Sequence, residues 1–555
     1  MSNKTKSKPI SQERLAELED MLISMLAQER GEEAIRLMME MFTTMSRENT
    51  ELQLRLQKQL KARFGQSSEK VSGAQLSLFL EMLGVDESEA EEEPQPDADA
   101  DAWQKDAELE QHFEQRQRRK KQRRRRGRNP LPKNLPREEI TLPVPQSHRV
   151  CSVCGNDKSC LGHDKSEVLE WVPGSFKVQV YAREKLACKP CQGSVTIAPV
   201  ADKIIEGGLP GPALLTEIVL KKFKYAQPLW RQAEFFTTQG VRLAESTLCG
   251  WVKAVAGLLE PVYKEIKRVA LLSHCINTDD SHIRVLDRTH PKGIKRGAMW
   301  VYVGDGLHAF FDYTPDRSRA GPARVLDGYT GYIQADAYSV YDVFFEGEEA
   351  SCVEVGCAMH CRRYFVEALD AGATDAAPAI AWFRHLYKIE EYAKDIGADS
   401  QKRLELRQEK SVPVMEDLGK WIVAKSKSTT KDTPLGKALG YASRQWDALN
   451  QFLVDGALEI DNGLAERTIR TLAIGRKNYM FAGSDDGAQW AAILYSLIAS
   501  CQLAKIDAGA YLRDVMSKIA AQWPQSRLAE LTPARWAGSP RSTDPYHGAT
   551  VQRQV

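Results

Sequence analysis

The sequence predicts a multidomain protein of the α+β class, and three observations lead to this prediction. The chain has 555 residues, which at roughly 150 residues per domain corresponds to about three or four folded units. Apolar residues recur at helical spacing near the N-terminus, whereas strand-like segments begin at His274. Two Cys-x-x-Cys pairs stand between these regions. The predicted order is therefore helices, a cysteine-containing module, a second helical region and a sheet domain.

The composition is that of a largely folded protein. Hydrophobic residues make up 43% of the chain and charged residues 27%, close to globular averages. The longest apolar run, residues 491–504, is shorter than the roughly 20 residues that a bilayer span needs. The lysine-rich N-terminus lacks the apolar core of a secretion signal. We therefore expect a cytoplasmic protein whose eleven cysteines are metal ligands and core residues rather than disulfides.

Residues 10–80 are expected to form coiled-coil or oligomerisation helices. Apolar side chains step alternately by three and four positions over three heptads. Asn49 interrupts this seam, and one polar residue there can fix register and oligomer state. An amphipathic helix packed on its own domain is the alternative. The apolar positions of the seam are Ile35, Met38, Phe42, Met45, Leu52 and Leu56.

An acidic segment and a basic segment follow one another. Residues 81–101 hold ten acidic and no basic residues, whereas residues 116–128 hold ten Lys or Arg and no acidic residue. The acidic, Pro-containing composition predicts a disordered linker over 81–115. The two blocks cancel in the net charge of +1. That sum does not exclude a nucleic-acid partner, because a partner feels the local field, which decays within about 10 Å.

Residues 116–137 are interpreted as a DNA-binding arm. Pro130 pushes the preceding residue into an extended conformation, so Arg128 is a candidate for insertion into a minor groove. A solvated spacer, or an intramolecular partner for the acidic block, is the alternative. The candidate DNA-contacting residues of the arm are Arg118, Arg119, Lys120, Lys121, Arg123, Arg124, Arg125, Arg126 and Arg128.

The two Cys-x-x-Cys pairs predict a zinc ribbon over residues 145–200. Two such knuckles can close one tetrahedral site with zinc–sulfur bonds of about 2.3 Å, and a closed four-cysteine site is structural. Cys160 and His163 offer other ligands beside the first pair, and a redox role is a further alternative. The four predicted zinc ligands are Cys151, Cys154, Cys188 and Cys191.

Residues 205–262 contain three helix-like segments. Pro228 and Gly240 separate them, and the last opens at Ser246. The pattern fits a helix-turn-helix whose final helix would read DNA. A plain three-helix connector is the alternative.

Three aspartates in the sheet region are candidates for two metal-binding carboxylates. Asp279, Asp280 and Asp336 lie in or beside strand-like segments, where Asp is depleted. Carboxylates at strand ends facing one cleft suit a phosphoryl-transfer site with two divalent cations roughly 4 Å apart. Glu466 lies on an arginine-rich helix and is a candidate for the third carboxylate. From spacing alone, an i,i+4 ion pair of Glu466 with Arg470 is the alternative.

The ordered motifs together resemble one family, the large DDE transposase (TnpC type) of insertion-sequence family sixty-six. The similarity runs from about residue 35 to about residue 516. It includes LKARFGQSSEK, GRNPLPKNLPRE, the two Cys-x-x-Cys pairs, KYAQPLWRQAEFF, QADAYSVYD, GCAMHCRRYFVEA and DNGLAERTIRTLAIGRKNYMFAGSDDGA.

The resemblance implies an RNase H-like α/β catalytic core. Its two parts would be residues 270–370 and 456–520, around a helical insertion at 371–455 and before a C-terminal tail at 521–555. The resemblance implies a catalytic triad of Asp279, Asp336 and Glu466, which would bind two Mg²⁺ or Mn²⁺ ions. The chain departs from the family pattern at Asp280, where Glu is usual, and at Gly463, where a second Asn is usual. Asp280 is therefore a second candidate for the first metal ligand.

The implied activity is DNA transposition. The enzyme would bind double-stranded transposon ends, hydrolyse the phosphodiester there and transfer the freed 3′-hydroxyl to target DNA. Candidate phosphate contacts near the triad are Arg362, Arg363, Arg476 and Lys477, with His360 as a further site residue. The expected partners are further copies of the chain and TnpA- and TnpB-type accessory proteins. The expected location is the cytoplasm, with association to the nucleoid when the enzyme acts. The alternatives are a catalytically lapsed, zinc-containing DNA-binding regulator and a structure-selective nuclease on the same fold.

Overall fold

The computed structural model describes residues 109, 111–116, 174–180, 185–187, 195–197, 203–346 and 350–538. They fall into two compact units. Residues 203–233 and 244–538 belong to the first, and the described parts of 107–200 with 234–243 belong to the second. The predicted coiled coil, the acidic linker up to residue 108, the arm beyond Arg116 and the four zinc-ligand cysteines lie outside the described residues. Residues 109 and 111–115, at the end of the segment expected to be a disordered linker, are helical instead.

The second unit contains a short hairpin. Strand β1 (Lys185–Ala187) pairs antiparallel with β2 (Val195–Ile197). In sequence, Cys188 and Cys191 stand between these strands. The hairpin therefore falls within the segment predicted to be a zinc ribbon.

Three helices follow, as the breaks at Pro228 and Gly240 predict. They are α5 (Pro212–Phe223), α6 (Leu229–Thr238) and α7 (Glu245–Ala270). Gly240 has a φ of +82°, a left-handed conformation that favours glycine. The buried face of α7 contacts β5 and α16, and α5 contacts α17. Helices α5 and α7 thus pack within the unit that contains the sheet, and the helix-turn-helix interpretation stays a prediction.

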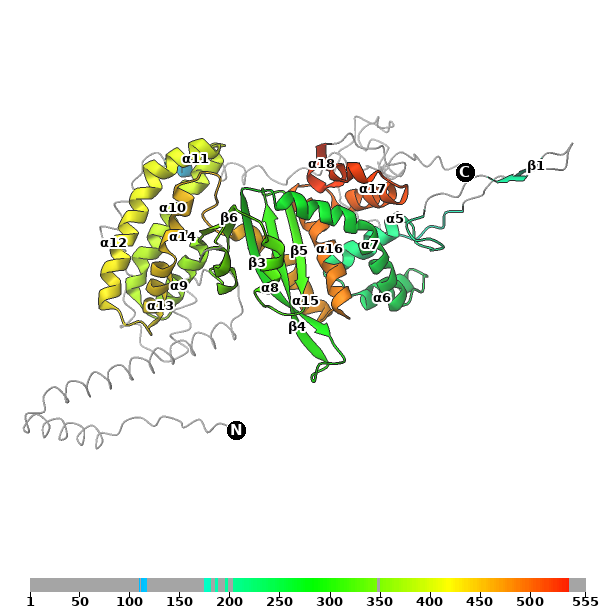
Figure 1. The fold of residues 1–555 in the computed structure, drawn as a ribbon, viewed down its shortest axis with the longest axis horizontal. Coiled ribbons are helices and arrows are strands. Elements are labelled where there is room, and N and C mark those ends of the chain that lie inside the picture. The colour runs from blue at the N-terminus through cyan, green and yellow to red at the C-terminus, as the bar shows by residue number, and fades with distance from the viewer. Residues whose placement is uncertain are drawn as a thin grey trace, which may run out of the picture. The chain divides into compact units, whose positions relative to one another are not determined.

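The first unit is built on a five-stranded mixed sheet (Figure 1). Its strands are β3 (Cys275–Leu286), β4 (Ile294–Gly304), β5 (His308–Thr314), β6 (Tyr332–Gln334) and β7 (Val353–Val355). Their order is β5-β4-β3-β6-β7, in which β3, β4 and β5 are antiparallel neighbours and β6 and β7 run parallel to β3. Between these strands lie α8 (Ala320–Leu326) and the 3-10 helix η4 (Ser339–Phe344).

Helices cover the free edge of β5. Ser496 of α16 (Asp485–Leu503) accepts a hydrogen bond from the Phe311 backbone N–H at 2.8 Å, and Ser500 accepts one from Ala309 at 3.0 Å. Tyr263 of α7 donates to the Phe311 carbonyl at 2.9 Å. These bonds satisfy backbone groups that an open edge strand would leave unpaired. The apolar run at 491–504 is therefore part of a core helix.

A helical subdomain packs on the β7 side of the sheet (Figure 1). It comprises α9 (Ala358–Asp370), α10 (Ala377–Asp395), α11 (Ser400–Leu406), a π-helical turn (Arg407–Ser411), α12 (Val412–Ser428), α13 (Pro434–Arg444) and α14 (Trp446–Asn450), with short 3-10 turns at Thr374–Ala376 and Gln451–Leu453. Apolar residues of α9, α10, α12 and α13 share one core with Val355 of β7. The interval 371–455, expected to be helical, lies within this subdomain.

The chain then returns to the sheet through α15 (Gly463–Tyr479) and α16, which contact β3 and β5 respectively. Helix α17 (Ala508–Ala520), the 3-10 helix η8 (Gln525–Leu531) and α18 (Pro533–Gly538) follow. Trp536 donates a hydrogen bond to Asp514 at 2.7 Å and its ring contacts Tyr511. Residues 525–538, expected as part of a tail, are therefore folded against α17.

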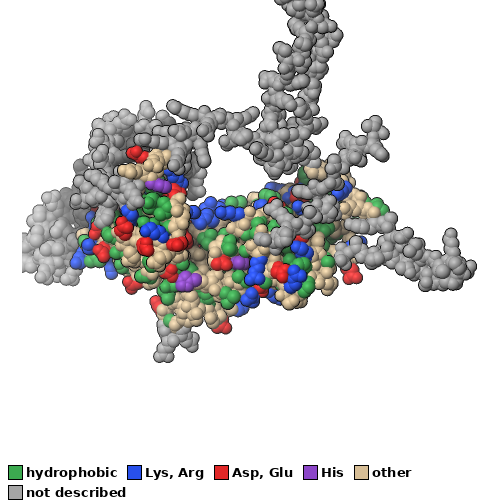
Figure 2. Space-filling view, turned by 90° about the horizontal axis from the view of Figure 1, so that it is seen from above, with side chains coloured by type: hydrophobic (Ala, Val, Ile, Leu, Met, Phe, Trp, Pro, Cys, Tyr) green, Lys and Arg blue, Asp and Glu red, His purple; other side chains and the backbone are tan. Residues whose placement is uncertain are grey.

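The face in Figure 2 carries both signs of charge. Asp and Glu side chains are more frequent over the helical subdomain, on the left, and Lys and Arg over the sheet domain. Among the helices that the structure describes, none combines the length and apolar character needed to cross a bilayer.

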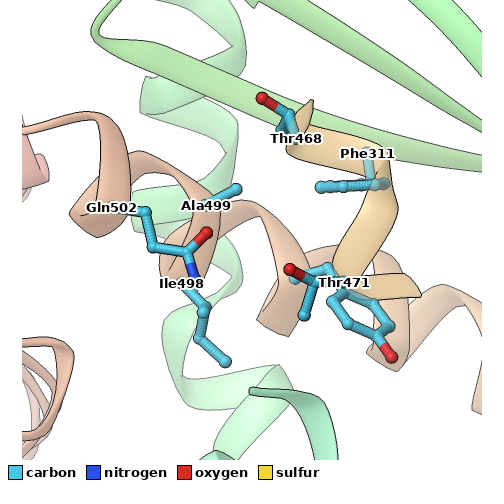
Figure 3. A pocket seen from close by; sticks show the side chains of 7 residues that line it. Phe311, Thr468, Thr471, Ile498, Ala499 and Gln502 are labelled. Atoms are coloured by element: carbon cyan, nitrogen blue, oxygen red, sulfur yellow. The ribbon is translucent and has the colours of Figure 1, made fainter. Parts of the chain in front are cut away.

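A small hollow lies between β5, α15 and α16 (Figure 3). It has no room for a water molecule, so it is a packing gap and offers no ligand site. Its lining residues are Phe311, Thr468, Thr471, Tyr495, Ile498, Ala499 and Gln502.

Candidate active site

The parallel pairing of β3 with β6 brings two of the candidate aspartates to the same level of the sheet. Asn277 of β3 is opposite Gln334 of β6. Asp279 and Asp336 each follow two residues later, and side chains two positions apart in a strand share one face. Strand β6 ends at Gln334 while β3 continues, so both carboxylates lie where the sheet narrows.

Glu466 joins them from α15, which packs against β3. Burial raises the pKa of Asp279 to about 7, and the carboxylates of Asp336, Asp280 and Glu466 add to the rise. The backbone N–H of Asp280 opposes it through a 2.7 Å hydrogen bond to Asp279. The three residues assigned to the triad from the resemblance are thus close enough for their charges to interact.

Alternation along β3 places the Asp280 side chain on the face of the strand opposite to Asp279, although its charge still contributes to the raised pKa of Asp279. The Asp280 carboxylate makes two hydrogen bonds with Arg317, at 2.7 and 2.6 Å. The Arg317 guanidinium lies over the Tyr338 ring, 4.2 Å from its centroid. Asp280 therefore has a protein cation of its own, which favours Asp279 as the metal-ligating member of the pair.

Glu466 has only weak protein partners. Its Oε1 is buried and accepts no hydrogen bond from the described residues. His360 Nδ1 is 3.5 Å from Oε1, and Arg363 Nη2 is 3.9 Å from Oε2. Among the described residues, Glu466 makes no ion pair with Arg470, the alternative that spacing alone left open.

A buried network of hydrogen-bonded side chains lies next to the three carboxylates. Asn277 donates to Gln334 at 2.8 Å and to the Asn462 side chain at 3.2 Å. Asn462 donates to the Thr278 carbonyl at 2.8 Å, which ties the start of α15 to β3. Gln334 and Asn462 are fully buried. The network fixes the two strands and the helix that carry the three carboxylates.

Sequence reasoning missed Asn277 and Gln334, although a signal was present. Each stands two residues before a candidate aspartate and directly after a buried isoleucine. A polar side chain at that place in a buried strand needs a hydrogen-bond partner. The equal spacing indicates that the two residues partner one another.

The donor set fits hard divalent cations. Asp279, Asp336 and Glu466 offer carboxylate oxygens, the ligands that Mg²⁺ and Mn²⁺ prefer. The raised pKa of Asp279 and the unpartnered Oε1 of Glu466 are both conditions that a bound cation relieves.

A second set of ligand atoms meets at Glu466. Cys357 Sγ, His360 nitrogen and a Glu466 oxygen lie within 4.8 Å of one another. Burial raises the pKa of the Cys357 thiol to about 12. The thiol accepts a hydrogen bond from the Asn462 backbone N–H at 3.3 Å, and its Sγ lies 3.2 Å from His360 Nδ1. These contacts hold Cys357 and His360 beside Glu466.

Two of the cations named as phosphate contacts, Arg363 and Arg476, lie near this cluster. Arg476 Nη1 donates to Ser281 Oγ and to the His282 carbonyl, both at 2.6 Å, so it links α15 to β3. Lys477 and Arg363 are exposed and Arg362 is half-buried. The cationic arm lies outside the described residues, apart from Arg116.

Four segments of the chain match families of known proteins. Residues 207–490, more than half of the chain, match the Transposase IS66 family. Residues 51–140 match the family described as Transposase C of IS166 homeodomain, residues 148–192 the zinc-finger binding domain of transposase IS66, and residues 496–534 the IS66 C-terminal element. The third match supports zinc binding, and the first implies use of a divalent metal.

Three similar proteins come from Sinorhizobium fredii (strain NBRC 101917 / NGR234), and each is described as uncharacterized. The protein y4hP is 31% identical over 440 residues, which cover 75% of this chain and 78% of y4hP. The protein y4jD is 30% identical over 420 residues, covering 73% and 81%, and y4qI is 30% identical over 394 residues, covering 68% and 72%. Together with the four matched segments, these similarities establish that the chain belongs to the IS66 family of transposases.

Proposed function

We propose that this transposase cleaves DNA at transposon ends and joins the freed 3′-hydroxyl to target DNA at a triad of Asp279, Asp336 and Glu466. The observation that carries the proposal is the meeting of these three carboxylates, with Asp280 paired separately to Arg317. The sheet has three antiparallel neighbours, β5, β4 and β3, followed by β6 and β7, which run parallel to β3. This arrangement supports an RNase H-like core.

In the proposed mechanism, Asp279 and Asp336 would hold two Mg²⁺ or Mn²⁺ ions, and Glu466 would complete the site. Such ions, when bound, stabilise charge on the attacking and leaving oxygens of an in-line phosphoryl transfer. Glu466 orients the nucleophile, water in the first step and the 3′-hydroxyl in the second. The Asn277, Gln334 and Asn462 network holds these carboxylates in place before substrate binds, which lowers the cost of reaching the reactive geometry.

The remaining regions are assigned supporting roles. Cys151, Cys154, Cys188 and Cys191 are proposed to bind one structural zinc ion. Residues 10–80 are proposed to join copies of the chain, and the cationic arm and the helix-turn-helix-like region to hold DNA. TnpA- and TnpB-type proteins are proposed as accessory partners, in the cytoplasm and at the nucleoid.

The triad is tested with Asp336→Asn and Glu466→Gln. Each variant is expected to lose Mg²⁺-dependent nicking and strand transfer on DNA from the inverted repeats that bracket the gene. Asp280→Asn, the matched control, keeps both activities because its charge is already paired with Arg317. Activity retained by either triad variant would refute the assignment.

Two substrates separate the proposed reaction from its alternatives. Uncut ends report hydrolysis, and pre-cleaved ends with a free 3′-hydroxyl report joining. A transposase yields joined product from pre-cleaved ends. Cut product without joining indicates a nuclease, and bound but unreacted DNA indicates a lapsed enzyme.

A further inference from the structure

The strands β3 and β4 extend beyond the rest of the sheet as a two-stranded ribbon. Strand β4 pairs with β5 only from Ala298 onward, and β3 pairs with β6 only up to Asn277. Among the described residues, the one backbone pairing at the outer edges of the distal part, residues 283–297, is a bridge between Val285 and Ala482. Figure 1 shows this hairpin projecting past the neighbouring strands.

Two arginines face each other across the ribbon. Arg284 of β3 is directly opposite Arg296 of β4, and both are exposed. Directly opposed residues share one face of an antiparallel pair, and like charges there are destabilising. Neither arginine makes an ion pair with a carboxylate among the described residues. The repulsion is therefore not offset within this part of the chain.

A third arginine joins them at the free edge of β3. The Arg284 carbonyl accepts a hydrogen bond from Ala482, so carbonyls at even positions of β3 face this edge. Arg476 donates to the carbonyl of His282, at the same edge. Burial lowers the pKa of His282, and the charges of Arg476, Arg296 and Arg284 lower it further. Register and this hydrogen bond thus place all three arginines near His282.

Exposed apolar side chains border the same edge. Leu286, Met480 and Phe481 are 39%, 59% and 41% exposed. The ribbon therefore presents arginines without carboxylate partners among the described residues, next to apolar groups. This combination suits nucleic acid, which has a charged backbone and apolar faces on its sugars and bases.

We propose that Arg284, Arg296 and Arg476 bind the phosphate backbone of the DNA duplex that flanks the cleaved bond. The inference deepens the proposed function and rests on it for the position of that bond. Arg284 lies five residues beyond Asp279, about 17 Å along an extended strand, and the odd separation places its side chain on the other face of β3. Because DNA rises about 3.4 Å per base pair, a distance of this size corresponds to about five base pairs, so the ribbon is expected to contact flanking duplex and not the reacting phosphate. Guanidinium groups suit this role because they bind phosphate oxygens in pairs.

The test is the salt dependence of DNA binding by the full chain. A 30-base-pair duplex of arbitrary sequence is titrated in chelator, where no cleavage occurs, at several salt concentrations. Each lost phosphate contact lowers the slope of log K against log salt by about 0.9. The double variant Arg284→Gln/Arg296→Gln is therefore expected to lose about 1.8 in slope. Arg284→Lys/Arg296→Lys, which keeps both charges, is expected to keep the slope and shows that the ribbon tolerates substitution.

The matched control removes two arginines that already have carboxylate partners. Arg268 pairs with Glu265, and Arg527 pairs with Glu530, so Arg268→Gln/Arg527→Gln is expected to leave the slope unchanged. An equal loss in this control, or an unchanged slope in the ribbon variant, would overturn the proposal. An unchanged slope with weaker binding of polyglutamate would assign the ribbon to an acidic protein segment instead.

These outcomes are independent of catalysis. A chain that cuts and joins DNA but shows no change in slope refutes the ribbon and leaves the proposed function standing. A chain that loses slope in the ribbon variant but never cuts DNA supports the ribbon and refutes the proposed function.

Discussion

Asp279 shows how one side chain can be prepared for a cation by its surroundings. Its carboxyl is largely removed from water and has other carboxylates as neighbours, and burial is the larger cause of its raised pKa, about 7. Asp280, the next residue, has Arg317 within 2.6 Å. Two adjacent aspartates thus have opposite electrostatic environments because they point to opposite faces of β3.

This difference predicts the pH dependence of stability in the metal-free protein. The pKa of Asp279 is about 7 in the folded state, against about 4 in an unfolded chain. The folded state therefore holds a proton that the unfolded state releases. The resulting stabilisation is fully present below about pH 4 and is lost as pH rises through about 7, by at most about 1.4 kcal/mol per pH unit.

Urea unfolding in chelator at pH 5, 6 and 7 measures this effect. The unfolding free energy of the unsubstituted chain is expected to fall with pH relative to that of Asp279→Asn, which has no proton to lose. Added Mg²⁺ is expected to stabilise the unsubstituted chain more at pH 8 than at pH 5. Parallel pH profiles for the two chains would contradict the raised pKa.

The candidate site was predictable from sequence only in part. Asp279, Asp336 and Glu466 stood out through strand context and family resemblance, and the structure brings them together. The choice between Asp279 and Asp280 was open because it depends on the position of Arg317, 37 residues away from Asp280. Asn277 and Gln334 were missed because their partnership exists only once β3 and β6 are paired.

At the scale of elements, a buried arginine links the helical subdomain to the segment before α15. Arg407, fully buried in the π-helical turn, makes two hydrogen bonds with Glu390 of α10, at 2.7 and 2.8 Å. It also donates to the carbonyls of Phe452, Asp455 and Leu458. One side chain thus fixes the loop that leads back to the helix bearing the candidate glutamate.

Arg407→Met is therefore expected to destabilise the protein strongly. Removing one partner of a buried ion pair leaves the other charge unpaired and costs about 3–5 kcal/mol. Arg384→Met on the same subdomain is the control, because Arg384 is exposed and such substitutions change stability by less than about 0.5 kcal/mol. Urea denaturation of both variants measures the difference, and equal midpoints would show that the buried network adds little.

Helices and strands were predictable from the sequence where the segment buries one face, because apolar residues then recur with the period of the helix or strand. The long strands β3, β4 and β5 lie in the region predicted to contain strands from His274 onward, and α5, α6 and α7 lie between the predicted breaks. The boundary expected at residue 262 does not appear because α7 continues to Ala270 and packs on α16. Such long-range packing, like the folding of 525–538 against α17, leaves no mark in local composition.

At the scale of the whole molecule, the net charge of +1 conceals a strongly uneven distribution. Ten acidic residues in 81–101 precede ten cations in 116–128. The folded part adds the cationic ribbon of β3 and β4, near the candidate triad along the same strand. The cationic arm and the ribbon are two separate surfaces proposed for DNA, on different units of the chain.

Deleting residues 116–128 separates their contributions to binding. If the arm contacts phosphates, the deletion lowers the slope of log K against log salt by about 0.9 per lost contact, and by at most about nine for its ten cations. Deletion of residues 86–98 is the length-matched control. Its charged residues are all acidic, so the deletion is expected to keep the slope and to raise affinity for non-specific duplex, because less negative charge then competes for the cations. If deletion of the arm leaves the slope unchanged, residues 116–128 are a spacer and the folded domains alone bind DNA.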